Sequence, residues 1–169
     1  MAETTNPSFL VDAYSDPVLI RVRGRASFAN SGSLREFLSE MMSQGKRRFV
    51  IDFSACTGMD STFLGVLAGL ALDLRKSKPR GVAVFCRLGT RNLELIRNLG
   101  LHRLATVDLG GDLTPTGNAV EPLAATRMDE LENARMCLEA HENLVEADQA
   151  NQEKFQDVLV FLKNRVDQG

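Results

Sequence analysis

The sequence predicts an α/β fold, with a mixed β-sheet, helices packed on it, and an α-helical C-terminal extension. Strand-like and helix-like segments alternate between residues 18 and 109, an order typical of an α/β domain whose partly parallel sheet is covered by helices. From residue 124 to residue 168 the chain is acidic and has neither glycine nor proline, which predicts the helical extension. With 169 residues, the chain is long enough for one core of ordinary size.

The first expected elements are a hairpin and a helix. Residues 8–14 and 17–24 are strand-like, with the turn signal Asp16-Pro17 between them. A helix should follow, because apolar residues recur at helical spacing: Leu34, Phe37, Leu38, Met41 and Met42. Ser33 and Glu36 have the spacing of a capping box, and Gly45 is placed to end the helix in a left-handed conformation.

The remaining elements of the sheet follow in strict alternation. Buried-type strands are expected at residues 48–53 and 82–86, and a short strand at residues 104–109. An amphipathic helix over residues 63–74 lies between the first two, and its glycines are expected to permit close packing on the sheet. Thr90 can cap a further helix, which Gly100 should end. These elements define a domain over residues 1–110, a linker over 111–123 and an extension over 124–169.

The extension is expected to form two helices of about 20 and about 17 residues, with Asp148 as N-cap of the second. One continuous helix is the alternative. The predicted buried stripe of the first helix consists of Met128, Leu131, Arg135, Leu138 and His141. Residues 1–112 carry 15 Lys+Arg and 11 Asp+Glu, whereas residues 113–169 carry 5 and 11, so the extension is the acidic part. Its apolar stripes need a partner, which could be the body, each other or a second chain.

Composition and motifs exclude several classes of protein. The longest apolar run, residues 63–72, is half of a membrane span, and no signal peptide is recognisable, so a cytoplasmic protein without membrane insertion is expected. The weakly basic body has no aromatic residues among its arginines, which disfavours direct nucleic-acid binding. The three cysteines have neither metal nor disulfide spacing. Because no nucleotide-binding or nucleophile motif accompanies His102 or His141, we expect no enzyme, metal or cofactor, and take both histidines as structural.

The residues that carry chemistry lie at the junction of strand 48–53 and helix 63–74. Asp60, Ser61 and Thr62 are all good helix caps. A hydroxyl at a helix N-terminus is also well placed to accept a phosphate, since free backbone N–H groups and the helix dipole favour negative charge there. From spacing alone, Ser61 as a simple cap and Ser61 as a switch both remain open.

Residues 8–109 resemble a STAS domain of the bacterial anti-sigma factor antagonist kind. The sharpest part of the resemblance is a strand followed by Asp-x-Ser-x-x-x-x-x-Asp-Ser-Thr, formed here by Asp52, Ser54, Asp60, Ser61 and Thr62. The stretch LELIRNLGLHRLATV is similar to the final helix and strand of that family. Many members have glycine where this chain has Phe63, which could either alter the fit of a partner or point into the core.

The resemblance implies a phosphorylation-controlled binding module in a bacterial partner-switching pathway. Ser61 would be the phosphoacceptor, with Thr62 as fallback and Asp60 shaping the site. The implied binding face comprises Asn30, Ser31, Asp60, Ser61, Thr62 and Phe63. Its partners would be a serine kinase that is also an anti-sigma factor, and a phosphatase. Alternatives are a STAS subunit of an ABC-type lipid transport complex, and a self-association module that forms a homodimer through the extension.

Overall fold

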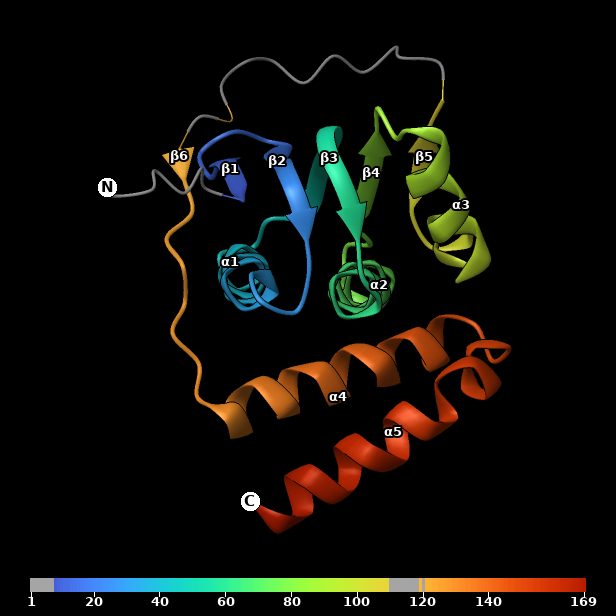
Figure 1. Cartoon of the computed structure of the whole chain (residues 1–169). Helices are drawn as coiled ribbons and strands as arrows, with labels where there is room; N and C mark the ends of the chain where they lie inside the picture. Colours follow the sequence, from blue (N-terminus) through green and yellow to red (C-terminus); the bar gives the residue numbers. More distant parts are fainter. Residues whose placement is uncertain (1–7, 110–118, 120) are drawn as a thin grey trace.

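A computed structural model of the chain describes residues 8–109, 119 and 121–169. Its centre is a six-stranded mixed sheet in the order β5-β4-β3-β2-β1-β6 (Figure 1). The strands are β1 (Phe9–Asp12), β2 (Val18–Ala26), β3 (Arg48–Met59), β4 (Val82–Cys86), β5 (Thr106–Asp108) and β6 (Glu121–Pro122). Strands β2 to β5 pair in parallel, and β1 pairs antiparallel with both β2 and β6. The predicted mixed sheet is therefore confirmed.

Helices α1 (Ser31–Ser43) and α2 (Ser61–Lys76) cover one face of the sheet, and α3 (Thr90–Asn98) lies beside β5 (Figure 1). The short 3-10 helix η1 (Leu101–Arg103) links α3 to β5. Strands β2 and β3 run parallel, and each is followed by a helix. Helices α1 and α2 therefore both begin at the carboxyl ends of these strands, on the same side of the sheet. The main core fills the space between the sheet and these helices and includes five fully buried phenylalanines: Phe9, Phe49, Phe53, Phe63 and Phe85.

The helix ends agree with the sequence only in part. Gly45 and Gly100 have φ of 90° and 79°, in the left-handed region where glycine was expected to end each helix. The predicted capping box is wrong, because α1 begins at Ser31, two residues before Ser33, and its N-cap makes no side-chain hydrogen bond. Thr90 is likewise the first residue of α3, and Gly89 occupies the N-cap position.

The extension forms two helices, α4 (Glu130–Ala147) and α5 (Asn151–Gln168), and the single-helix alternative is wrong. Asp148 follows the end of α4 instead of capping α5 directly, and its carboxylate accepts a hydrogen bond from the Ala150 backbone. The predicted linker contains one feature the sequence did not reveal, the edge strand β6. Residues 110–118 and 120 of that linker lie outside the described residues.

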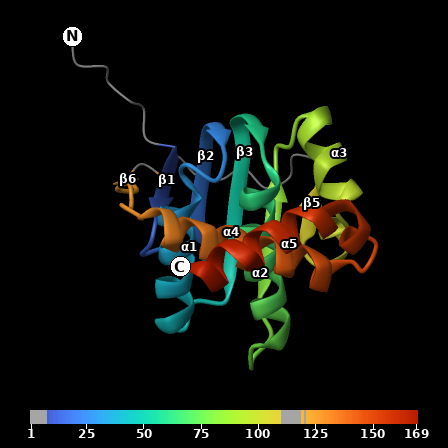
Figure 2. The same cartoon turned by 60° about the horizontal axis from the view of Figure 1, so that its bottom comes forward.

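The extension lies against the body. Helix α4 crosses beneath α1 and α2, and α5 packs on the outer side of α4 (Figures 1 and 2). None of the helices within residues 8–109 and 121–169 is both long and apolar enough to cross a lipid bilayer. The molecule therefore has three layers: the sheet, the pair α1 and α2, and the tail helices.

Candidate functional site

The site is built at the junction of β3 and α2. Strand β3 ends at Met59, and Asp60 has extended backbone and forms the N-cap of α2. One oxygen of the Asp60 carboxylate accepts a hydrogen bond from the Phe63 N–H (2.9 Å), which satisfies a free donor of the first helical turn. The other oxygen accepts from the Phe28 N–H (2.8 Å), in the loop between β2 and α1. Asp60 therefore ties together the two segments that the sequence predicted to form the binding face.

Ser61 is the first residue of α2 and is partly buried. Its Oγ lies 2.8 Å from Nε2 of His141, which is in the middle of α4. The other ring nitrogen, Nδ1, lies 2.7 Å from the Cys137 carbonyl oxygen, which can only accept a hydrogen bond. We therefore assign the proton to Nδ1, so that in the neutral ring Nε2 accepts and the Ser61 hydroxyl donates.

His141 belongs to the candidate site by its contact with Ser61, which sequence reasoning missed. It is 4% exposed and lies edge-on to Phe155 of α5, with ring centroids 5.1 Å apart. The sequence identified it as a helix-face residue but gave no indication that it contacts Ser61, 80 positions away. A signal was present in its spacing, since Cys137 and His141 are four residues apart on one helix face.

The residues after Ser61 point inward. Thr62 is 5% exposed, and its hydroxyl lies 3.7 Å from the Cys137 sulfur. Phe63 has no exposed side chain, stacks on Phe9 and meets Phe53 edge-on. Of the two alternatives left open for Phe63, the ring has the inward-pointing one in this structure, and a contribution of Phe63 to a partner surface stays a prediction.

The loop before α1 is held by its own polar side chains. Asn30 accepts a hydrogen bond from the Ser27 N–H (2.9 Å) and donates to the Arg25 carbonyl (2.9 Å). Ser31 is fully buried and its hydroxyl donates to the Ser27 carbonyl (2.6 Å). These two side chains therefore shape the loop, whereas Phe28, which the sequence analysis did not select, is 53% exposed at its tip.

A groove of about 650 Å³ runs beside this loop, between the start of α1 and the segment that leads into α4. Phe28 and Asn30 line one side, and Thr126, Met128 and Asp129 line the other. Ser61 does not line it. In residues 8–109, 119 and 121–169, no group of three or more His, Cys, Asp or Glu side chains is arranged to hold a metal ion.

The Ser61–His141 pair has the separation of a nucleophile and a general base. In a hydrolase the ring is oriented by a third group and the hydroxyl faces a space for substrate. Here the third group is a backbone carbonyl, and the nearby Asp60 carboxylate is occupied by the N–H groups of Phe28 and Phe63. The Ser61 hydroxyl lies at the contact between α2 and α4.

The comparisons with known proteins agree with this architecture. Residues 9–110, more than half of the chain, match the profile of the family described as "Mlab, STAS domain". The chain therefore belongs to the STAS family. The match ends before α4, so the tail lies outside the family domain. A search among curated proteins gave no significant match.

Solved structures with a similar fold include an anti-sigma factor antagonist from Mycobacterium paratuberculosis, with 20% identity and a TM-score of 0.55 over 66% of this chain and 93% of that chain. Bacillus SpoIIAA in its phosphorylated form has 18% identity and a TM-score of 0.50, over 62% of this chain and 94% of that one. SpoIIAA in its unphosphorylated form, titled an anti-sigma factor antagonist, has 19% identity and a TM-score of 0.48, over 53% and 81%. At these identities the similarity to the first two structures establishes the fold alone.

Proposed function

We propose that this STAS protein is a phosphorylation-controlled binding module, similar in role to the anti-sigma factor antagonists, in which Ser61 accepts the phosphate. The observation that carries the proposal is the position of Ser61 as first residue of α2, directly after the Asp60 cap. Backbone N–H groups of a first helical turn lack intrahelical partners, and the helix dipole favours negative charge there. A phosphate at this point is compatible with an intact helix and changes the surface by close to two negative charges.

Two further observations support the proposal. The site lies within the region that matches the STAS profile, residues 9–110. A structure with the same fold is titled as the phosphorylated form of SpoIIAA, so the fold has been seen in a phosphorylated protein. The proposed partners are a serine kinase that is also an anti-sigma factor, and a phosphatase, acting in the cytoplasm.

The proposed contact surface is the loop at Phe28, which is exposed, together with the start of α2. Asp60 joins these two parts through hydrogen bonds to the backbone of both. Thr62 remains the fallback acceptor, although its hydroxyl is more deeply buried than that of Ser61.

The decisive experiment is phosphopeptide mapping of the full-length protein purified from its own cells in several growth conditions. We expect one phosphate, on Ser61. The exposed Ser54 in the same strand–helix segment is the matched control: Ser54→Ala should keep the phosphate and Ser61→Ala should lose it. Once the partner is identified, Ser61→Asp should bind it at least about tenfold more weakly than Ser61→Ala, equivalent to about 1.4 kcal/mol. Phosphate found elsewhere while Ser61 is unmodified contradicts the assignment.

A second candidate is a STAS subunit of an ABC-type lipid transport complex, which would dock on the ATPase without phosphate. The specific observation in its favour is the description of the matched profile, "Mlab, STAS domain". Copurification with an ATPase, together with an unmodified Ser61 in every condition, would favour this candidate over the first.

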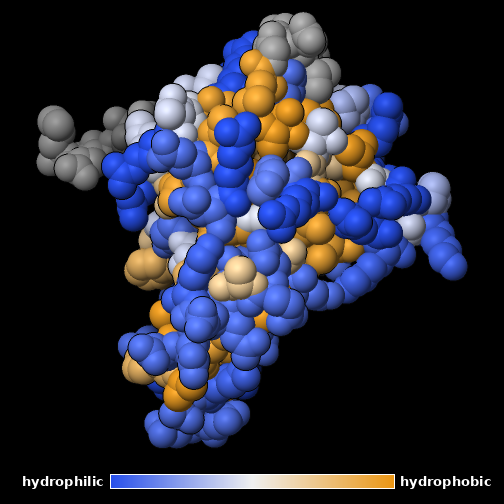
Figure 3. All heavy atoms as spheres, turned by 90° about the vertical axis from the view of Figure 1, so that its right-hand side faces the viewer, coloured by the Kyte–Doolittle hydropathy of each residue, from blue (hydrophilic) through white to orange (hydrophobic). Residues whose placement is uncertain are grey.

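Self-association through the extension is also proposed. Helix α5 exposes three apolar side chains, and Phe161 is 68% exposed, the largest apolar side chain that the tail leaves open. Apolar atoms are visible among polar ones in the lower part of Figure 3, where the tail helices lie. Sedimentation velocity of the full chain and of Phe161→Glu tests this: a dimer that dissociates in the variant supports the contact.

A further inference from the structure

Helix α4 crosses α2 at two glycines that leave room for its backbone. A Cβ atom at Gly65 would overlap the backbone carbonyl of Ala140, and one at Gly69 would overlap the amide of Asn143. Asn143 also donates a hydrogen bond to the Gly65 carbonyl (3.3 Å). Small residues on both helices thus bring the two backbones close together, because the side chains at a helix crossing set the distance between the helix axes.

Charged pairs flank this crossing on both sides. Arg35 of α1 pairs with Glu139, and Lys76 at the end of α2 pairs with Glu146 at 2.8 Å. The acidic side chains come from α4 and the basic ones from the body, in keeping with the separation of charge between residues 1–112 and 113–169. These pairs are exposed, so they set the orientation of α4 more than its affinity.

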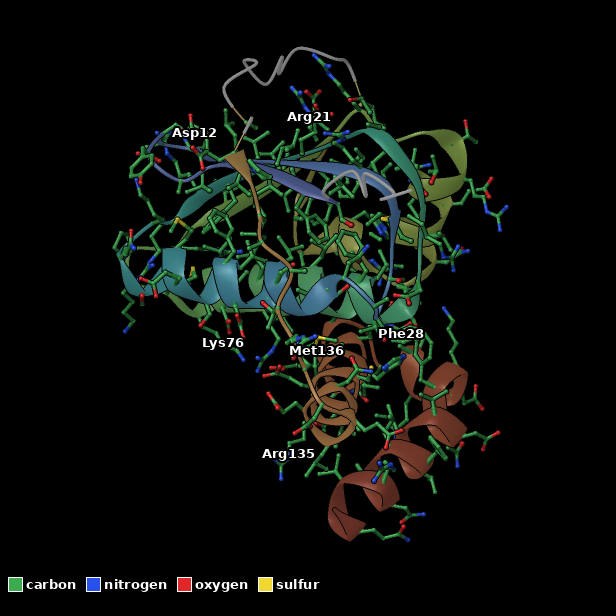
Figure 4. The ribbon with its side chains drawn as sticks, turned by 60° about the vertical axis from the view of Figure 1, so that its left-hand side comes forward. Asp12, Arg21, Phe28, Lys76, Arg135 and Met136 are labelled. Atoms are coloured by element: carbon green, nitrogen blue, oxygen red, sulfur yellow. The ribbon has the colours of Figure 1, made fainter. Side chains whose placement is uncertain are left out.

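The segment that leads into α4, together with Met136 of α4, also covers the start of α1. A Cβ at Gly32 would overlap the sulfur of Met128, and the sulfur of Met136 is the next side-chain neighbour. Figure 4 shows Met136 directed toward the layer of α1 and α2, whereas the adjacent Arg135 points away from it. One segment, residues 128–146, therefore lies over the start of α1 and over the start of α2, of which the second is part of the proposed contact surface.

A buried side-chain amide connects the junction of α4 and α5 to the body. Asn151, at the start of α5, is fully buried and donates hydrogen bonds to the Leu99 carbonyl (2.9 Å) and the Leu144 carbonyl (2.7 Å). The first bond joins the tail to the end of α3, and the second fixes the end of α4. Loss of this side chain would take from the Leu99 carbonyl the hydrogen bond that joins α3 to the tail, whereas the Leu144 carbonyl would keep the Asp148 N–H as donor (3.1 Å).

We propose that α4 is an intramolecular occupant of the α2 face, so that the chain is closed until α4 is displaced by a partner helix. This inference rests on the proposed function, because it takes the start of α2 as the partner surface. The partner that fits is a helix like α4, with a small residue opposite Gly65 and carboxylates that reach Arg35 and Lys76. A kinase reaches the Ser61 hydroxyl only after the bond to His141 has opened.

The native cysteines provide a direct test in the full-length chain. The Cys137 thiol lies between α4 and Thr62, and burial raises its pKa, so it should react slowly with N-ethylmaleimide while α4 is docked. Cys86 is fully buried in the sheet and reports global unfolding. Peptide mass mapping resolves the two rates in one sample.

The test variant is Gly65→Ala, whose methyl group displaces the α4 backbone while alanine favours the α2 helix. Its control is Gly89→Ala, because a Cβ there meets no atom within 4 Å and its φ is −70°. We expect Cys137 to react at least about tenfold faster in Gly65→Ala, with Cys86 unchanged, and no change in the control. Asn151→Ala should release α4 in the same direction by a different route.

Two results of the cysteine labelling would overturn the inference. One is a Cys137 labelling rate in the folded wild type equal to the rate in urea. The other is a Cys137 labelling rate that neither Gly65→Ala nor Asn151→Ala alters.

Incubation with ATP and an extract of the source cells then tests access to Ser61, where Gly65→Ala should incorporate phosphate at least about tenfold faster than the wild type. Phosphate incorporated at Ser61 at the same rate in both proteins, despite faster Cys137 labelling, refutes α4 as the barrier. Faster labelling with Ser61 unmodified in both supports the closed state and counts against the proposed function.

Discussion

The carboxylate of Asp60 and the backbone N–H of Phe28 are joined by a 2.8 Å hydrogen bond across 32 positions of sequence. The second oxygen of the same carboxylate caps α2 at Phe63, 2.9 Å away. A single side chain therefore sets the position of the exposed Phe28 loop relative to Ser61. This relationship matters for the proposed binding function, because the Phe28 loop and the start of α2 would have to contact the partner together.

Asp60→Ala should lower the free energy of unfolding by about 2 kcal/mol, because it removes a helix cap and a second charge-assisted hydrogen bond. Asp60→Asn should lower the free energy of unfolding by about half as much. Its amide oxygen can still accept from the Phe63 N–H, whereas its NH₂ group faces the Phe28 N–H and two donors cannot form a hydrogen bond. Urea unfolding measures both values. Hydrogen exchange adds a residue-level check: the Asn variant should lose protection at Phe28 and keep it at Phe63. Equal protection at both amides would contradict the two-way bond.

Phe63 should act as a core residue and not as a contact residue. Its ring stacks on Phe9 with centroids 6.1 Å apart and meets Phe53 at 6.5 Å. Phe63→Ala should cost about 3–5 kcal/mol of stability, and Phe63→Leu about 1 kcal/mol. Partner affinity of the Leu variant should equal that of the wild type. A Leu variant that loses only about 1 kcal/mol of stability and yet binds the partner more weakly would support Phe63 as a contact residue.

The Cys86 thiol predicts a specific loss of stability at alkaline pH. Burial, with Asp52 nearby, raises the pKa of Cys86 from 9.0 to about 11, so the folded chain holds the thiol proton more tightly than the unfolded chain. The contribution is fully present below pH 9 and is lost as the pH rises from about 9 to about 11. The free energy of unfolding should therefore fall by about 2 kcal/mol more in the wild type than in Cys86→Ala over that range. Parallel pH profiles of the two proteins would refute this.

The local elements were predictable because each is encoded in a short stretch of sequence. The hairpin around Asp16-Pro17 and the left-handed glycines at positions 45 and 100 need only neighbouring residues to be specified. The placement of Asp60 as cap of α2 is of the same kind. The order of strands and helices followed from these segments and from the rule that alternation gives a partly parallel sheet.

The tail interface could not be predicted, because it depends on two surfaces that meet only in the folded chain. The buried residues of α4 are Ala134, Met136, Ala140, His141 and Leu144, of which the predicted stripe contained only His141. That stripe followed large side chains, whereas the observed contact depends on small ones, above all Ala140 against Gly65. The glycines of α2 were expected to pack on the sheet and instead face α4. The Ser61–His141 bond was out of reach for the same reason.

A chain that ends at residue 123 should remain folded and become prone to self-association. All five strands from β1 to β5 lie before that point, and β6, at Glu121–Pro122, is retained with its pairing to β1. Among the described residues, Leu144 is the one buried member of the main core that comes from the tail, so the core between the sheet and the helices α1 and α2 loses a single buried residue. Removal of α4 uncovers the α2 face around Val66, and an apolar surface of this kind favours association.

Circular dichroism of the shortened chain should show the sheet with less helix, and light scattering should show oligomers. Val66→Lys in the shortened chain is the control and should restore the monomer, because it places a charge in the uncovered face. A shortened chain without sheet structure would show that the tail is needed for the body to fold.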